Sequence, residues 1–158
     1  MKYMESFRKS CNKGFTLIEL LIVIAILGIL ASATLVAINP VDKINAANDS
    51  RVQSDIASLA NASVAYSTTH NGLFPAVITD LTASGEIKVV PSAPTGYTYY
   101  FAGVPSGCAA GTTCTDVIIT SPLKSSKFTT PGTPNWRFES STGKICAVAS
   151  PASTTACP

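Results

Sequence analysis

Apolar residues fill one early block of the chain and later recur with two different periods. The block runs from Leu20 to Ile38 without a charged residue, and Glu19 stands directly before it. The 24 residues from Phe15 to Ile38 would form a helix about 36 Å long, enough to cross a bilayer core of about 30 Å. The pattern therefore predicts a membrane-spanning helix over residues 15–39.

A helical period follows this block. Pro40 lacks a backbone donor, so we expect a kink or a break in the helix close to it. Beyond Pro40, residues recur in steps of four and three along one helix face, namely Val52, Ile56, Leu59, Ser63 and Tyr66. The stripe predicts an amphipathic helix over residues 40–71, with Asp49 among the polar residues expected off the stripe. Gly72 is suited to the end of the helix.

The period then changes to that of strands. Residues 72–94 carry turn signals and predict a connecting loop, with a short turn of helix near residues 81–87. Aromatic, β-branched or alternating segments predict four strands at residues 97–101, 116–120, 135–139 and 144–148, with a turn at 140–143. The expected fold class is α+β, a long N-terminal helix packed on an antiparallel sheet of about four strands within residues 95–158.

Five cysteines bear on the compartment and on cross-links. Cys11 lies in a short basic N-terminal segment, and four cysteines remain after it, an even number that suits an oxidising compartment. Four cysteines allow three connectivities. The pairs Cys108–Cys114 and Cys146–Cys157 close the shortest loops, and we favour them. A zinc site is a weaker alternative, because the spacings lack the close pairs typical of zinc knuckles.

The junction before the apolar block has a specific composition. Residues 1–14 carry four basic residues and one acid, and the sequence Gly14-Phe15-Thr16-Leu17-Ile18-Glu19 follows. This arrangement resembles the class III signal of type IV pilins and of type II secretion pseudopilins. The resemblance covers about the first third of the chain. It implies a leader of residues 1–14, cleavage after Gly14 by a prepilin peptidase, and N-methylation of Phe15.

Glu19 is the residue to which the resemblance gives a mechanism. A charge inside a spanning segment costs roughly 2.5–3.5 kcal/mol on insertion scales, so it calls for a functional reason. Leader removal would create an amine on Phe15, and Glu19 of one subunit could pair with the Phe15 amine of its neighbour where water is excluded. Gly28 and Pro40 bracket the second half of the predicted membrane-spanning helix. Both residue types lower helix stability, so the segment between them could stretch or melt on assembly.

Charge and composition argue against other classes of function. The formal charge of the whole chain is +2, from eleven Lys and Arg and nine Asp and Glu. Removal of the leader takes away four basic residues and Glu5, so the remaining chain has seven basic and eight acidic side chains. A near-neutral chain makes nucleic-acid binding by the monomer unlikely. His70 is the one histidine, and no nucleophile motif or phosphate-binding loop accompanies it. We therefore expect no enzyme and no cofactor. With only Asp116 and Glu139 as acids after residue 95, we also expect no calcium or other metal.

The interpretation is a structural subunit of a type IV pilus-like filament. Basic residues on the N-terminal side place that end in the cytoplasm, so the chain would cross the inner membrane once and carry its C-terminus outside. Its expected partners are other pilins in a homo- or hetero-polymer, the prepilin peptidase, an inner-membrane assembly platform, and membrane lipid before assembly. Two alternatives stay open, a type II secretion pseudopilin and a membrane-anchored extracytoplasmic binding domain that never polymerises.

Overall fold

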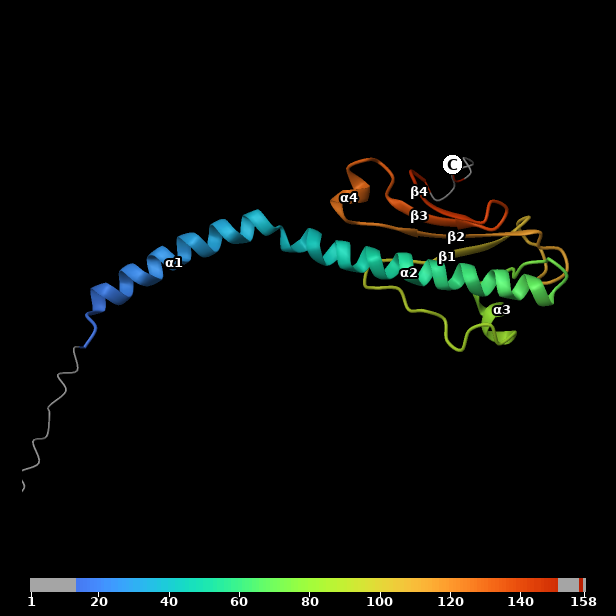
Figure 1. The fold of residues 1–158 in the computed structure, drawn as a ribbon, viewed down its shortest axis with the longest axis horizontal. Coiled ribbons are helices and arrows are strands. Elements are labelled where there is room, and N and C mark those ends of the chain that lie inside the picture. The colour runs from blue at the N-terminus through green and yellow to red at the C-terminus, as the bar shows by residue number, and fades with distance from the viewer. Residues whose placement is uncertain (1–13, 151–156, 158) are drawn as a thin grey trace, which may run out of the picture. The chain divides into compact units, whose positions relative to one another are not determined.

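The computed structural model describes residues 14–150 and residue 157. The expected leader, residues 1–14, therefore lies outside the described residues except for Gly14. The helices are α1 (Leu17–Ile38), α2 (Pro40–Thr69), α3 (Ile78–Ala83) and α4 (Ser126–Thr129). The strands are β1 (Tyr100–Val104), β2 (Asp116–Pro122), β3 (Asn135–Glu139) and β4 (Lys144–Val148) (Figure 1). The chain forms two compact units, residues 1–39 and 40–158, which we call unit 1 and unit 2.

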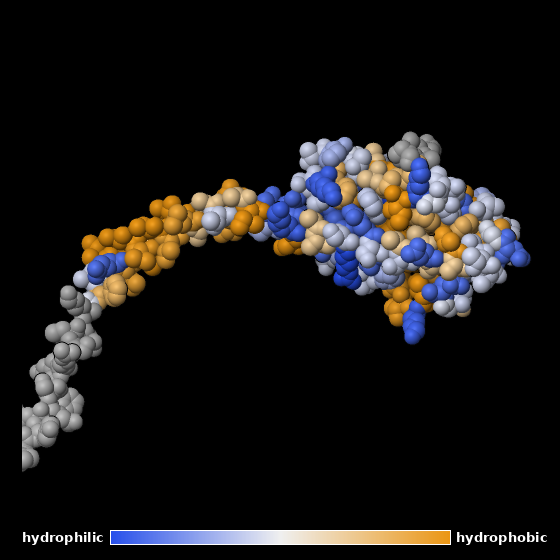
Figure 2. All heavy atoms as spheres, in the orientation of Figure 1, coloured by the Kyte–Doolittle hydropathy of each residue, from blue (hydrophilic) through white to orange (hydrophobic). Residues whose placement is uncertain are grey.

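Unit 1 is built on α1, and no residue of this helix is buried within the chain. Figure 2 shows that the face of α1 in view is largely apolar beyond the start of the helix. Asn39 takes a left-handed conformation (φ 44°, ψ 73°) and ends α1 at Ile38, and Pro40 opens the next helix. The break that Pro40 predicted is therefore present. Among the described residues, one helical stretch, Leu17–Thr69, is long and apolar enough by composition to cross a membrane.

Unit 2 packs α2 against an antiparallel sheet, and the predicted α+β class is confirmed. The strands lie in the order β1-β2-β3-β4, each paired with the next. Figure 1 shows α2 running along this sheet. The bounds of β3 and β4 agree with the predicted strands and β2 continues two residues further, to Pro122.

The core of unit 2 lies between α2 and the sheet. Val52, Ile56 and Leu59 are fully buried, as the periodic stripe predicted, and Tyr66 is nearly so. Burying one such aliphatic side chain contributes about 1.5–3 kcal/mol. They pack in one cluster with side chains from the sheet and α3, among them Val117, Ile119, Phe138 and Leu81.

Two predicted elements are displaced along the chain. The first strand was expected at residues 97–101 but spans Tyr100–Val104. The reason lies in Tyr97 and Tyr99, whose hydroxyls donate to Asp49 (2.7 Å) and Asp55 (2.5 Å) on α2. The aromatic run thus serves as an anchor to the helix before the sheet begins. The short helix was expected near residues 81–87 but begins at Ile78, because the Asp80 carboxylate accepts the backbone N–H groups of Ala76 and Val77 ahead of the helix.

The position of Asp49 differs from the expectation. The sequence placed it among the polar residues off the apolar stripe of α2, but the structure buries it. Its side chain is in the core at 1% exposure. Oδ1 accepts from the Tyr97 hydroxyl and the Lys124 N–H (3.0 Å), and Oδ2 accepts from the N–H (2.9 Å) and hydroxyl of Ser125. Burial alone would raise the pKa of Asp49, but these bonds outweigh it and hold the pKa below its ordinary value. Burial and the bond to Asp49 raise the pKa of Tyr97.

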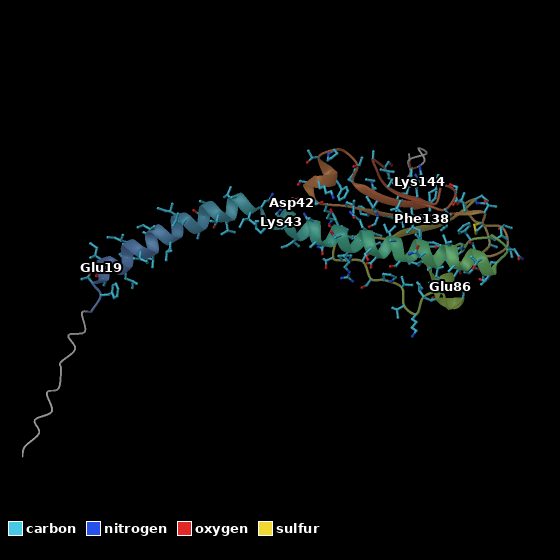
Figure 3. The ribbon with its side chains drawn as sticks, viewed as in Figure 1. Glu19, Asp42, Lys43, Glu86, Phe138 and Lys144 are labelled. Atoms are coloured by element: carbon cyan, nitrogen blue, oxygen red, sulfur yellow. A yellow bond between two sulfur atoms is a disulfide. The ribbon has the colours of Figure 1, made fainter. Side chains whose placement is uncertain are left out.

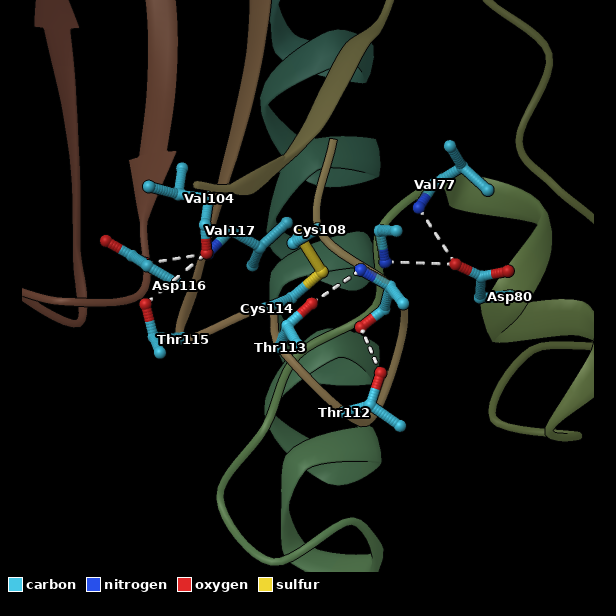
Figure 4. Close-up of a disulfide and its surroundings, with 12 residues drawn as sticks. Val77, Asp80, Val104, Cys108, Thr112, Thr113, Cys114, Thr115, Asp116 and Val117 are labelled. Carbon is cyan, nitrogen blue, oxygen red and sulfur yellow. Dashed lines mark hydrogen bonds between the residues drawn. A yellow bond between two sulfur atoms is a disulfide. The ribbon is translucent and has the colours of Figure 1, made fainter. Parts of the chain in front are cut away.

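Two disulfides cross-link unit 2. Cys108 is bonded to Cys114, six residues away, and Cys146 to Cys157, eleven residues away. Figure 4 shows the first bridge, which closes a loop within the connection between β1 and β2. The backbone fixes this loop in place, because the Phe74 N–H donates to the carbonyl of Cys114 and the Gly111 N–H donates to the carbonyl of Phe74. The favoured shortest-loop pairs are thus the pairs that the structure contains.

Candidate functional site

The candidate site is the beginning of α1, where Thr16 and Glu19 cap the helix reciprocally. Thr16 is the N-cap, in extended conformation (φ −80°, ψ 151°). The Glu19 N–H donates to its Oγ1 at 3.3 Å, while Glu19 Oε2 accepts from both the N–H and the hydroxyl of Thr16 at 2.9 Å. This is a capping box, which satisfies N–H groups that a helix start otherwise leaves unpaired.

The local sequence explains this geometry. A threonine followed three residues later by a glutamate is the usual capping-box pattern ahead of an apolar run. A carboxylate in the first turn also lies favourably in the field of the helix dipole. Sequence reasoning that treated Glu19 only as a buried charge missed Thr16, although the spacing of the two residues was the signal.

The residues of the expected cleavage junction lie beside this cap. Gly14 and Phe15 directly precede Thr16 and are exposed, with Phe15 at 88%. Glu19 is exposed as well, and its carboxylate is held through Thr16 next to the residue that would carry the new amine (Figure 3 labels Glu19 on α1). The structure therefore brings Glu19 and the Gly14-Phe15 junction to the same end of α1.

The two residues expected to loosen the helix lie elsewhere. Gly28 is in the middle of α1, and a Cβ built on it would meet no atom within 4 Å. Packing within the chain therefore gives no reason for a glycine there. Pro40 is the first residue of α2 and follows the left-handed Asn39. Neither residue contacts the capping box through a described bond.

The histidine and the acids that the sequence analysis considered for catalysis or metal binding make contacts within unit 2. The His70 ring stacks on Tyr66 at 3.8 Å between centroids, and its Nδ1 lies 2.9 Å from the Tyr66 carbonyl oxygen. Asp116 accepts the Val117 and Ser141 N–H groups and the hydroxyl of Ser140 at the turn after β3.

Glu139 pairs with a buried arginine of its own strand, since its Oε1 lies 3.5 Å from Nη2 of Arg137. Within residues 14–150 and 157, no group of three or more His, Cys, Asp or Glu side chains is placed to hold a metal. The start of α1 is therefore the candidate site, where the sequence singles out Glu19 and the structure adds Thr16 to it.

Comparison with known proteins locates the resemblance in this region. No curated protein and no solved structure matched the chain. A protein-family model described as the prokaryotic N-terminal methylation motif matches residues 9–35, which include the junction, the capping box and most of α1. The chain thus carries the class III prepilin signal of type IV pilins and pseudopilins.

Proposed function

We propose that the protein is a structural subunit of a type IV pilus-like filament. The leader is removed after Gly14, Phe15 is N-methylated, and the subunits polymerise with α1 inward. Glu19 of each subunit pairs with the Phe15 amine of a neighbour. The N-terminal methylation motif supports the broader assignment to a pilin- or pseudopilin-like precursor.

The observation that carries the proposal is the combination of an unburied apolar helix with one carboxylate held at its start. None of the side chains of α1 is buried within the described chain, so this apolar surface needs a membrane or other helices around it. In such surroundings an unpaired charge is costly, and breaking a buried pair costs on the order of 3–5 kcal/mol. A carboxylate can accept about four hydrogen bonds, so the two that Thr16 donates to Glu19 leave capacity for an ammonium.

Before assembly the subunit waits in the cytoplasmic membrane, anchored by α1 with unit 2 outside. The two disulfides support this placement, because they persist in oxidising compartments. The prepilin peptidase cleaves the leader on the cytoplasmic side, and an inner-membrane platform feeds processed subunits into the filament. The protein acts by assembling, without catalytic turnover.

The same signal occurs in pseudopilins, so a short secretion filament is the second candidate function. A membrane-anchored binding domain that never polymerises differs in kind, because it would need neither the cleavable junction nor a carboxylate at Glu19. Recovery of long surface filaments would favour the pilus, and their restriction to the periplasm would favour the pseudopilus. A protein that stays monomeric after processing would support the binding domain.

Variants at the capping box test the pairing. Glu19→Gln keeps the side-chain length and an oxygen that can accept from Thr16, but it removes the charge. Thr16→Ala removes the hydroxyl of the cap but keeps the charge. We expect Glu19→Gln expressed alone to give no sheared filaments, and Thr16→Ala to assemble at reduced yield, since an N-cap contributes about 1 kcal/mol.

Mass spectrometry of both variants provides the control. Each should still yield a chain that begins at methylated Phe15, because the Gly14-Phe15 bond is unchanged. If Glu19→Gln assembles normally while Thr16→Ala does not, the role of Glu19 is to cap the helix, and charge pairing is not the assembly rule. A mature protein that begins at Met1 would remove the pilin assignment.

A further inference from the structure

Three lysines gather at the end of unit 2 where α2 begins. Lys43 lies in the first turn of α2, and Lys124 and Lys127 flank the start of α4. All three are exposed. Figure 3 labels Lys43 beside Asp42 at this end, and Figure 1 shows α4 next to the first turns of α2. We call this region, formed by the first turns of α2 and by residues 124–129, the basic end of unit 2.

Carboxylates of α2 hold the two segments together. Asp42 accepts the N–H of Ser126 at 2.7 Å and its hydroxyl at 2.9 Å. Asp49, seven residues further along α2 and therefore on about the same helix face, accepts the N–H groups of Lys124 and Ser125. Because these contacts join residues more than 70 positions apart in sequence, the lysines are neighbours by virtue of the fold.

The acids and the lysines of this region have different partners. The carboxylates of Asp42 and Asp49 point at backbone N–H groups and hydroxyls. The ammonium groups of Lys124 and Lys127 lie over the rings of Tyr97 and Phe128, each 5.1 Å from the centroid. Asp49 thus serves the fold from within the core and Asp42 from a partly exposed position, while the lysines present their charge at the surface.

Exposed apolar side chains accompany the lysines. Val41 is 66% and Ile44 62% exposed, on either side of Lys43 in the first turn and a half of α2. Apolar side chains next to a lysine with a long aliphatic stem are typical of helices that lie at a membrane surface. The chain also reaches this end of unit 2 immediately after its apolar span, since α1 ends at Ile38 and α2 begins at Pro40.

We propose that the basic end of unit 2 docks on the headgroups of anionic phospholipids in the membrane that holds α1. The lysines contact headgroup phosphates, and Val41 and Ile44 rest against the interfacial region. Docking holds the unassembled subunit at the membrane surface and ends when the subunit enters the filament. This inference rests on the membrane anchoring proposed above.

General electrostatics sets the expected size of the effect. A lysine near an anionic bilayer surface shifts a docking equilibrium by about fivefold, so removing two should lower the ratio of docked to undocked protein by about twenty-five-fold. The attraction acts within about 10 Å at 0.1 M salt and about 3 Å at 1 M. High salt should therefore release unit 2 without extracting α1.

The single tryptophan offers a direct probe. Trp136 packs edge-on against Phe128 of α4, with 5.9 Å between ring centroids. The full chain is reconstituted in vesicles that carry a nitroxide quencher on their headgroups, either of pure phosphatidylcholine or with a third of the lipid replaced by phosphatidylglycerol. We expect stronger quenching of Trp136 with phosphatidylglycerol, and loss of that difference at high salt.

Charge-matched variants identify the surface responsible. Lys124→Gln/Lys127→Gln should abolish the difference between the two lipid mixtures. Lys88→Gln/Lys144→Gln removes the same charge elsewhere and should preserve it, because Lys144 begins β4 at the β3–β4 turn, the opposite end of that hairpin from α4. Circular dichroism and intact disulfides verify that both variants are folded.

Two failures can be told apart. Protein that does not float with the vesicles contradicts membrane anchoring and hence the proposed function. The docking inference alone is overturned if the protein floats but Trp136 is quenched equally in both lipid mixtures. It is also overturned if the two double variants lose the quenching difference between the lipid mixtures to the same extent.

Discussion

α1 and α2 follow one another along the chain, yet they are stabilised in different ways. α1 is uniformly apolar and buries no residue within the chain. α2 is mixed in polarity and buries a continuous stripe that includes Val52, Ile56 and Leu59. In α1 the fold supplies no packing partner, so its surroundings must. In α2 the sheet supplies that partner.

The carboxylates of the two helices repeat the contrast. Glu19 is held by a residue three positions away and stays exposed. Asp49 is held by residues 48 to 76 positions away and is buried. A locally satisfied carboxylate remains available to an outside partner, whereas one that is surrounded by its own fold is committed to stability.

The largest test of the comparison exchanges one leucine in each helix. Leu59→Ala should lower the free energy of unfolding of unit 2 by about 2–5 kcal/mol, because it leaves a cavity in a fully buried site. Leu27→Ala, its matched control in α1, should leave that free energy unchanged. Urea titration in detergent micelles, followed by Trp136 fluorescence, measures both. Equal losses would mean that α1 contributes to the stability of unit 2.

A second test uses Asp49. Asp49→Ala should destabilise unit 2 by about 2–3 kcal/mol, because buried donors such as the Ser125 N–H lose their acceptor. The pKa of Asp49 is held below its ordinary value, so its contribution is present above the unfolded pKa of about 3.9 and is lost as the pH falls through the folded pKa.

Asp49→Asn is the control for the pH dependence, because it keeps one acceptor oxygen and cannot titrate. The stability difference between wild type and Asp49→Asn should shrink as the pH is lowered below about 4. A difference that stays constant from neutral to acidic pH would show that Asp49 acts through shape and not through its charge.

The smallest test concerns Gly28. Gly28→Ala should stabilise α1 by about 1 kcal/mol through helix propensity, since the added Cβ meets no atom of the chain. Hydrogen exchange of the α1 amides in bilayers should slow around residue 28, while urea unfolding of unit 2 stays the same. Unchanged exchange would indicate that Gly28 does not loosen the helix.

The sequence predicted the parts of the fold that depend on local pattern. The strands at Asn135–Glu139 and Lys144–Val148 were found because their alternation and the turn between them are contiguous. The stripe of α2 was found because its period matches that of a helix. The N-terminal motif around Gly14 and Glu19 was recognised because it is short and specific, and the family model matches residues 9–35, while the roles of the individual residues stay predictions.

The features that the sequence did not reveal depend on partners distant in the chain. The burial of Asp49 and the position of α4 follow from contacts across more than 70 residues, which no local period encodes. β1 was misplaced for a related reason, since Tyr97 and Tyr99 have the composition of a strand but bind acids of α2. Thr16 had a recognisable spacing, and its significance emerged with its hydrogen bonds.

The left-handed Asn39 and the proline that follows it have a consequence for how such a chain can change. Asn39 ends the hydrogen-bond ladder of α1, and Pro40 brings no N–H to the next helix. A recombination event at this dipeptide would therefore separate two inheritable modules at little cost in backbone bonding. One module would carry the N-terminal methylation motif, and the other a surface free to diverge.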